Sequence, residues 1–140
     1  CTGDVHPARH RGTAMTVYLA GLFDSRARLR AERARLIAAG LAVNSTWLDA
    51  PEDASYAKPE APLGQIATKD LDEIDAADLL IVDTLDVTPR GGREFEAGFA
   101  VGRGKPVLVI GPARNVFHHL CPRFESWDDL FASEGTLVPT

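Results

Sequence analysis

The segment 91–100, Gly-Gly-Arg-Glu-Phe-Glu-Ala-Gly-Phe-Ala, is the densest group of residues that could do chemistry. Two glycines ahead of a helix form a turn whose backbone N–H groups, together with the helix dipole, can hold an anion. The residues that could contact such an anion are Arg90, Gly91, Gly92 and Arg93. Glu94 and Glu96 follow in the first turns, where the dipole favours the ionised carboxylate that a nucleophile needs. Spacing alone does not choose between these two glutamates, and either could be solvated surface.

Further carboxylates stand where they could face the same ligand: Asp70, Asp83 and Asp86. Carboxyl groups in different environments allow one site to run both a nucleophilic and an acid–base step. The segment 70–75, Asp-Leu-Asp-Glu-Ile-Asp, is equally typical of an acidic helix surface, so composition alone assigns these residues no role. Tyr18, in the first apolar run, could be an ordinary core residue.

Several ligand classes lack their usual sequence patterns. The chain has no Gly-x-x-x-x-Gly-Lys loop, no Gly-x-Gly-x-x-Gly after its first apolar run and no zinc-type spacing, so neither a dinucleotide cofactor nor a zinc site is expected. The net charge of the 140 residues is −5, and the arginines of 26–35 alternate with Ala and Leu as on a solvated helix face. No nucleic acid polymer is therefore expected as a partner. The apolar runs are about strand length, so no membrane span is expected either.

The chain has two cysteines, Cys1 and Cys121. Cys1 lies in a segment expected to be disordered, so no structural disulfide is predicted. Two lone thiols fit a reducing compartment, which predicts a cytoplasmic location.

The elements that must position the candidate side chains follow from the hydrophobic pattern. Short apolar and β-branched runs predict strands at 16–20, 41–48, 78–83 and 106–111. Helical spacing between stop signals predicts helices from an N-cap at Asp24 or Ser25 to Gly40, at 65–77, from Gly91 to about Arg103, and at 127–132. In the third of these helices, Phe95, Phe99 and Gly102 are expected to face the core.

Strands that alternate with helices predict an α/β domain with a parallel sheet and helices on both faces. Ligands of such sheets bind beyond the carboxyl ends of the strands. Gly21 and Phe23 follow the first strand and Asp83 ends the third, so they are candidate substrate contacts. Trp47, near the end of the second, could stack on a base or pack in the core.

Residues 15–140 are expected to form this one domain. Residues 1–14 are polar and lack periodicity, which predicts a disordered tail or an added upstream segment. Residues 49–63 hold three prolines and many acids, so they are expected to form a long loop, and such loops often serve as lids.

Three segments occur in an order and spacing typical of one family. Residues 16–23 (Thr-Val-Tyr-Leu-Ala-Gly-Leu-Phe) read as an aromatic-bearing strand that runs into Gly and then Phe. Residues 69–74 (Lys-Asp-Leu-Asp-Glu-Ile) precede an apolar strand, and residues 96–100 (Glu-Ala-Gly-Phe-Ala) precede Gly-Lys-Pro-Val at 104–107. Over residues 16–111 the chain resembles nucleoside 2-deoxyribosyltransferases and the related deoxynucleoside 5′-monophosphate N-glycosidases.

The resemblance implies roles for three side chains. Glu96 matches the nucleophile that forms a covalent 2-deoxyribosyl-enzyme, Tyr18 the tyrosine that orients it, and Asp70 the acid that contacts the base. The resemblance also implies a flavodoxin-like (Rossmann-like) three-layer sandwich with a parallel sheet of four or five strands. It further implies a homodimer or larger homo-oligomer, a small-molecule nucleoside or nucleotide as partner, and no metal or organic cofactor.

Two positions depart from the family pattern. Arg90 stands where members carry another Asp that helps to protonate the leaving base, and Leu22 stands where they carry Pro or Trp. Asp83 or Asp86 could take over from the missing Asp. These departures bear on the exact reaction more than on the nucleophile.

The expected reaction is transfer of a 2-deoxyribosyl group from one base to another through a Glu96 intermediate, as in retaining glycosidases. One alternative is hydrolysis of deoxynucleoside 5′-monophosphates, with Arg90 and Arg93 holding the phosphate. A nucleotide-binding sensor without turnover and a flavodoxin-like redox module are further alternatives, because a fold does not determine a function.

Overall fold

The computed structural model describes residues 14–55, 57–58, 60–88 and 90–133. The tail predicted for residues 1–14 therefore lies outside the described residues, apart from Ala14. Within them, one sheet contains five strands: β1 (Thr16–Ala20), β2 (Ala42–Val43), β3 (Leu79–Asp83), β4 (Val107–Ile110) and β5 (Arg123–Phe124). All neighbours in the sheet are parallel, in the order β2-β1-β3-β4-β5. This is the order of a flavodoxin-like sheet, so the predicted α/β fold is confirmed.

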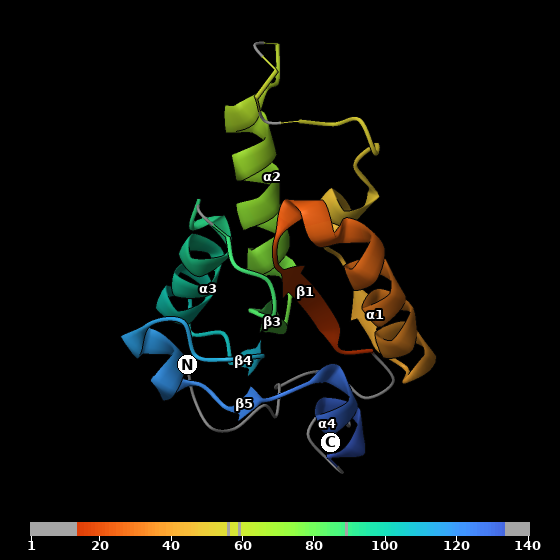
Figure 1. Cartoon of the computed structure of the whole chain (residues 1–140), viewed down its shortest axis with the longest axis vertical. Coiled ribbons are helices and arrows are strands. Elements are labelled where there is room, and N and C mark those ends of the chain that lie inside the picture. The colour runs from red at the N-terminus through yellow and green to blue at the C-terminus, as the bar shows by residue number, and fades with distance from the viewer. Residues whose placement is uncertain (1–13, 56, 59, 89, 134–140) are drawn as a thin grey trace.

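Helices cover both faces of the sheet: α1 (Arg26–Ala38), α2 (Leu63–Ala76), α3 (Gly92–Gly102) and α4 (Trp127–Ala132). α1 and α4 lie on one side and α2 and α3 on the other, which gives the predicted three layers (Figure 1). Short 3-10 turns join them: η1 (Phe23–Ser25), η2 (Thr46–Asp49) and η3 (Val116–Leu120). After β1 the chain forms β2 on one side of β1, then crosses to β3 on the other side and continues outward to β4 and β5. The carboxyl ends of β1 and β3 therefore form the switch point where such folds bind ligands.

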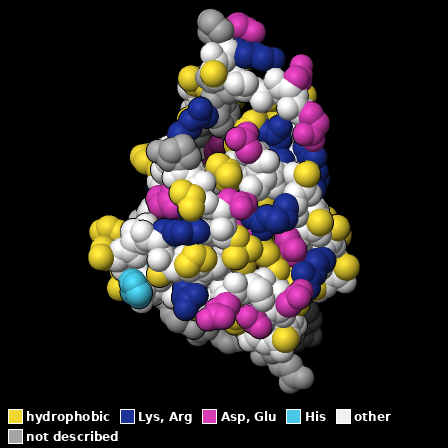
Figure 2. All heavy atoms as spheres, in the orientation of Figure 1, with side chains coloured by type: hydrophobic (Ala, Val, Ile, Leu, Met, Phe, Trp, Pro, Cys, Tyr) yellow, Lys and Arg dark blue, Asp and Glu magenta, His cyan; other side chains and the backbone are white. Residues whose placement is uncertain are grey.

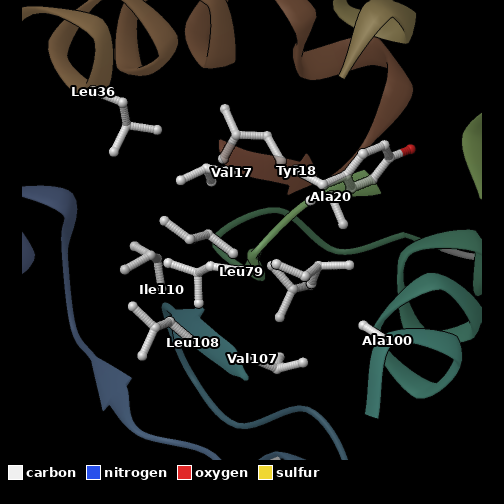
Figure 3. Close-up of a cluster of buried hydrophobic side chains, with 14 of the residues drawn as sticks. Val17, Tyr18, Ala20, Leu36, Leu79, Ala100, Val107, Leu108 and Ile110 are labelled. Atoms are coloured by element: carbon white, nitrogen blue, oxygen red, sulfur yellow. The ribbon is translucent and has the colours of Figure 1, made fainter. Parts of the chain in front are cut away.

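The core is built on the central strands. β3 and β4 are buried along their whole length, as is typical of parallel strands covered on both faces. Tyr18 of β1 is fully buried, yet its hydroxyl points out of the aliphatic cluster around it (Figure 3). The buried strand β1 therefore places the Tyr18 hydroxyl toward the layer formed by α2 and α3.

The second and last strands differ from the prediction. The strand predicted for 41–48 is only β2, because the chain then turns into η2, which buries Trp47 and Leu48. β5 was not predicted, since two residues carry no readable periodicity.

The predicted core face of α3 is wrong for Phe95 and Gly102, whereas Phe99 packs against the core as predicted. Phe95 is 69% exposed, while Arg93, Ala97 and Ala100 are the buried residues of this helix. The small alanines let α3 approach the sheet closely, and the larger Phe95 is left outside.

The expectation of a fully solvated arginine face on α1 is also wrong. Arg26 is only 5% exposed, and its guanidinium donates to the carbonyl oxygens of Phe23 and Pro51. Arg28 and Arg33 each form paired hydrogen bonds with one aspartate, Asp83 and Asp49 respectively.

Cys121 is disulfide-bonded and not a lone thiol, which contradicts the expectation of two unpaired cysteines. Cys1 lies outside the described residues. The thiol argument for a reducing compartment therefore loses its basis. In the described part of the chain, no helix is both long enough and apolar enough to cross a bilayer.

Candidate active site

A cavity of about 510 Å³ opens at the carboxyl ends of β1 and β3. Its walls come from the segment after β1, from α2, and from the first turns of α3. Among the candidate residues from the sequence, those that line it are Gly21, Phe23, Asp70, Arg90, Gly92, Arg93 and Glu96. Tyr18 does not line the cavity but donates a hydrogen bond to Glu96, which does. Asp83 and Gly91 do not line it.

Glu96 and Tyr18 form the contact at the centre of this site. Tyr18 Oη donates a hydrogen bond to Glu96 Oε2 at 2.6 Å. Burial, followed by the nearby charge of Glu96, raises the pKa of the Tyr18 hydroxyl, so it stays protonated and remains a donor. Because the ring of Tyr18 is packed in the core, this donor holds the carboxylate in one place.

The Glu96 carboxyl is not kept ionised by the helix dipole as expected. Burial raises its pKa to about 8, the Tyr18 hydrogen bond opposes this shift, and the charges of Asp70 and Glu73 add to it. Glu96 lies more than one turn after α3 begins at Gly92, where the dipole has largely decayed. At neutral pH the carboxyl therefore holds its proton most of the time, and losing that proton is a step that any nucleophilic role requires.

Asp70 of α2 lines the same cavity. Burial raises its pKa to about 6; the neighbouring Glu73 charge adds to the shift and Lys69 opposes it. Asp70 and Glu96 thus form a pair of carboxyl groups near one another, and the charge of Asp70 makes Glu96 harder to ionise. Such a pair can hold one proton over the pH range between its two pKa values.

The structure separates the two glutamates that sequence spacing could not. Glu94 turns away, and its Oε1 accepts from Arg93 Nε at 2.8 Å. Its other oxygen, Oε2, is buried with no hydrogen-bond partner among the described residues. Glu96 alone of the two lines the cavity.

The two candidate arginines also differ. Arg93 is 4% exposed, and its Nη1 donates to the carbonyl oxygens of Asp83 at 3.2 Å and Asp86 at 2.5 Å. Its guanidinium therefore holds the 83–86 turn. Arg90 is exposed and lines the cavity, which leaves it available to a ligand.

The glycine pair beside them forms the predicted turn. Gly91 adopts a φ of +75°, a left-handed conformation that favours glycine, and α3 begins at Gly92. Gly92, the first residue of α3, lines the cavity together with Arg90.

Asp83 is not brought to the cavity. It is 1% exposed and accepts hydrogen bonds from Arg28 Nη1 at 2.8 Å, Arg28 Nη2 at 2.9 Å and Trp127 Nε1 at 2.8 Å. Asp86 accepts from Ser25 Oγ and Arg28 Nη2, and these contacts lower its pKa. Neither carboxylate lines the cavity, so neither is placed to replace the family aspartate at position 90.

The segment after β1 brings the chain close to its neighbours. A Cβ at Gly21 would lie 2.7 Å from Leu29 Cδ1, so a larger residue there would require the Leu29 side chain to shift. Phe23 then lies on the cavity wall and stacks on Trp47, with ring centroids 6.3 Å apart. Trp47 is a core residue that also lines the cavity, and its stacking on a base stays a prediction.

Sequence reasoning missed some of the lining. Asp24 was considered only as a helix cap, yet it is exposed on the wall directly after Phe23. Its position just beyond a strand end is a signal that could have found it. The apolar residues Ile66 and Leu71 of α2, which were not among the candidate site residues, also line the cavity.

No group of three or more His, Cys, Asp or Glu side chains in the described ranges is arranged to hold a metal ion. On the face shown in Figure 2, basic and acidic side chains are interspersed, so this face presents no basic stripe.

Comparison with known proteins gives consistent matches. The family model described as Nucleoside 2-deoxyribosyltransferase matches residues 17–131. A 2-deoxyribosyltransferase from Bacillus psychrosaccharolyticus is similar in structure, with a TM-score of 0.70 and 22% identity over 89% of this chain and 96% of that one. No curated protein matches the chain.

Two further solved structures share the fold. For a 2-desoxiribosyltransferase from Leishmania mexicana the TM-score is 0.61, with 23% identity over 84% of this chain and 95% of that one. For a CMP N-glycosidase from Clostridium botulinum it is 0.53, with 21% identity over 84% and 95%. At these identities the likeness to single structures shows the fold.

Proposed function

The chain belongs to the nucleoside 2-deoxyribosyltransferase family, and from this premise we propose that it cleaves the N-glycosidic bond of 2′-deoxynucleosides through a covalent intermediate on Glu96. A second base then accepts the sugar. One observation carries the proposal: the 2.6 Å hydrogen bond from Tyr18 Oη to Glu96 Oε2, at the wall of a cavity of about 510 Å³. A carboxyl group oriented by a donor that cannot ionise, in a cavity of the size that small ligands occupy, is suited to attack an anomeric carbon.

The first half of the reaction breaks the bond to the base. Glu96, once deprotonated, attacks C1′ with one oxygen, and the C1′–N bond breaks with its electron pair going to the base. Asp70, which carries a proton below its pKa of about 6 and shares one with Glu96 above it, donates a proton or hydrogen bond to the departing base. A sugar without a 2′-hydroxyl favours this step, because that group would destabilise the cation-like transition state.

The second half reverses these roles. A nitrogen of the incoming base attacks C1′, the ester bond to Glu96 breaks, and the proton of the base returns to Asp70. If water attacks instead, the products are free 2-deoxyribose and regenerated Glu96. Transfer prevails over hydrolysis to the extent that water is kept out of the cavity.

The test is covalent trapping. Incubation with a 2-fluoro-2-deoxynucleoside should add the mass of one fluorinated sugar to the protein, and peptide mapping should place it on Glu96. Glu96→Ala should show no adduct, while Glu94→Gln, a matched change two residues away on the same helix, should be labelled like the unaltered chain. An absence of both adduct and base release across nucleosides and nucleotides would favour the sensor alternative.

Arg90 supports a second candidate, hydrolysis of deoxynucleoside 5′-monophosphates. It is exposed, lines the cavity, and lies beside the N-terminus of α3, where a phosphate can be bound. The similar fold of a CMP N-glycosidase is compatible with this reading. Arg90→Met should raise the KM for a monophosphate by about tenfold and leave that for the matching nucleoside unchanged; equal effects on both would count against a phosphate contact.

The predicted homo-oligomer and cytoplasmic location stay predictions. Light scattering of the purified protein measures the first directly.

A further inference from the structure

Glu73 of α2 is an acid beside the site to which the proposed reaction gives no role. Its carboxylate accepts two hydrogen bonds from one residue of η2, from Thr46 N at 3.1 Å and from Thr46 Oγ1 at 2.5 Å. Its carbonyl oxygen accepts a third, from Asn44 Nδ2 at 2.8 Å. Glu73 thus joins α2 to the segment 44–46, which lies 27 to 29 residues earlier in the chain.

The segment 44–46 is itself fixed to the central sheet. Ser45 is buried, and its Oγ accepts a hydrogen bond from Leu19 N at 3.0 Å. Trp47 follows directly, and its Nε1 donates to the Leu19 carbonyl oxygen at 2.8 Å. Glu73 therefore binds a part of the chain that β1 already holds in place, so the contact can fix the position of α2.

The two sides of this contact carry different walls of the cavity. Trp47, next to Thr46, lines it from η2. Asp70 lines it from α2, three residues before Glu73, and side chains at this spacing lie on the same side of a helix. Because a misplacement of about 1 Å can cost about 10²-fold in rate, the contact that joins these walls bears directly on any reaction between them.

The charge of Glu73 acts on the same site. Burial is the first cause of the raised pKa values of Tyr18, Asp70 and Glu96, and the charge of Glu73 adds to all three. These groups come from β1, α2 and α3, whereas both hydrogen-bond partners of Glu73 are uncharged. Lys69, also on α2, opposes the shift at Asp70. Glu73 therefore makes it easier for the carboxyl groups of the cavity to keep a proton.

We infer that Glu73 is a positioning residue: its contact with Thr46 fixes the place of Asp70 in the cavity, and its charge helps the site to retain the proton that the leaving base needs. Glutamine could form the same two bonds with Thr46, because its amide oxygen accepts from the N–H and its amide nitrogen donates to the hydroxyl. The contact alone therefore does not require an acid, but the second role does. This inference rests on the proposed function, in which Asp70 donates the proton.

Two variants separate the contact from the charge. Glu73→Gln keeps the contact and removes the charge, so Asp70 and Glu96 should ionise more easily. Both limbs of the profile of kcat/KM against pH should then move to lower pH by about half a unit or more. Thr46→Val keeps the charge and removes one hydrogen bond, so kcat/KM should fall by about threefold to tenfold at every pH, with both limbs unmoved.

The matched controls are conservative changes beside these positions. Asp72→Asn removes one charge from an exposed position of the same helix and should move neither limb. Thr46→Ser retains the hydroxyl and should restore the rate that Thr46→Val loses. Thermal unfolding of every variant, with Tm expected within about 3 °C of the unaltered chain, shows that the fold is kept.

Titration of Glu96 by carbon-13 NMR gives a readout that needs no turnover. Its signal is assigned by its loss in Glu96→Gln. The pKa of Glu96 should be lower in Glu73→Gln than in the unaltered chain by about half a unit or more, and unchanged in Asp72→Asn. If this is found while no nucleoside or nucleotide is cleaved, the proposed reaction fails and the effect of Glu73 on the site stands.

Two results would overturn the inference while leaving the proposed reaction intact. In one, Glu73→Gln lowers kcat/KM equally at every pH and moves neither the limbs nor the NMR titration, which would make Glu73 a structural residue only. In the other, Thr46→Val cleaves its substrates as fast as the unaltered chain, which would show that the contact does not position Asp70.

Discussion

Three aspartates beside α1 and two carboxyl groups of the cavity, Glu96 and Asp70, have opposite surroundings. On the α1 side, Asp83, Asp86 and Asp49 each accept hydrogen bonds from an arginine of that helix. On the α2–α3 side, Glu96 accepts from a neutral tyrosine, and its near neighbours include Asp70 and Glu73. The pKa values of Asp49 and Asp86 are lowered by their partners, whereas burial raises those of Glu96 and Asp70 to about 8 and about 6.

This difference separates acids that hold the fold from acids that can react. A carboxylate paired with arginine has its charge neutralised and its geometry fixed, so it adds to stability and resists protonation. A buried carboxyl beside other acids is destabilised in its charged form and can exchange protons near neutral pH. Both kinds stand near the carboxyl edge of one sheet, so position alone does not distinguish them.

The largest effect is expected from removing the nucleophile. Glu96→Gln keeps the shape of the side chain but cannot form an ester with the sugar, so kcat/KM for base release should fall by about 10⁴-fold. Chromatography of released base measures this. Glu94→Gln serves as control, and a Glu96→Gln variant with near-normal turnover would contradict the assignment.

Asp70→Asn should have the next largest effect. Removing a proton donor should cost about 10²-fold in kcat/KM at pH 7. With pKa values of about 6 and 8, the Asp70–Glu96 pair carries a single proton between these values, so activity should be bell-shaped with its maximum near pH 7.

The pH profile of Asp70→Asn sharpens this prediction. In this variant Glu96 must still lose its proton, so activity should still rise with pH. The fall above pH 8, which reports loss of the last proton from the pair, should disappear. A basic limb that survives unchanged would show that another group supplies the proton.

Asp83→Asn tests the aspartates that are paired with arginines of α1. The change removes the charge that faces Arg28 and weakens the bond from Trp127, so the protein should lose about 2 kcal/mol of stability. Thermal unfolding should show a decrease in Tm of about 5 °C. The kcat measured well below that temperature should be nearly unchanged, whereas a large fall in kcat without a fall in Tm would place Asp83 in the site after all.

Glu96 should also make stability depend on pH. Its folded pKa is raised, to about 8, above its value in the unfolded chain, so its contribution is complete at low pH and is lost as pH rises through 8. Glu96→Gln should therefore be more stable than the unaltered chain at pH 9 by on the order of 1–2 kcal/mol. The difference should shrink toward pH 5, as measured by urea unfolding at both pH values. Equal differences at the two pH values would contradict the raised pKa.

The smallest effect is expected for the exposed ion pair between α1 and Asp49. Arg33 and Asp49 pair at 2.8 Å, but the Asp49 side chain is 59% exposed, so solvent screens the interaction. Arg33→Met should change stability by less than about 0.5 kcal/mol. A loss as large as that of Asp83→Asn would remove the distinction between buried and exposed pairs on this helix.

Much of the fold was readable from local patterns. β1 and α4 were predicted to the residue, and β3, β4, α2 and α3 to within a few residues, because solid apolar runs and helical spacing report burial directly. β5 escaped prediction because its pairing with β4 comes from the end of a loop and not from its own two residues. Phe95 was misplaced because periodicity marks an apolar face without showing whether a neighbour covers it.

The site, like the fold, was predictable from the sequence only in part. Glu94 and Glu96 are equivalent in a sequence pattern, and only the angle at which α3 meets β1 decides that Glu96 reaches Tyr18. Arg93 and Arg90 likewise look alike as neighbours of a glycine pair, and both line the cavity, yet Arg93 is buried and donates to the 83–86 turn whereas Arg90 is exposed. Residues 49–63 were predicted to form a loop, but only the structure shows that Ala54 and Ala61 line a second cavity of about 340 Å³ beside α2.

By itself, the sequence determined the alternation of strands and helices, the edge of the sheet where ligands bind, and a short set of acids and arginines that could act there. Only the tertiary structure decided which acid met an arginine, which met a tyrosine, and which met another acid. The reason is physical: hydrophobic periodicity is a property of consecutive residues, whereas the cost of burying a charge depends on groups that folding brings together from distant parts of the chain.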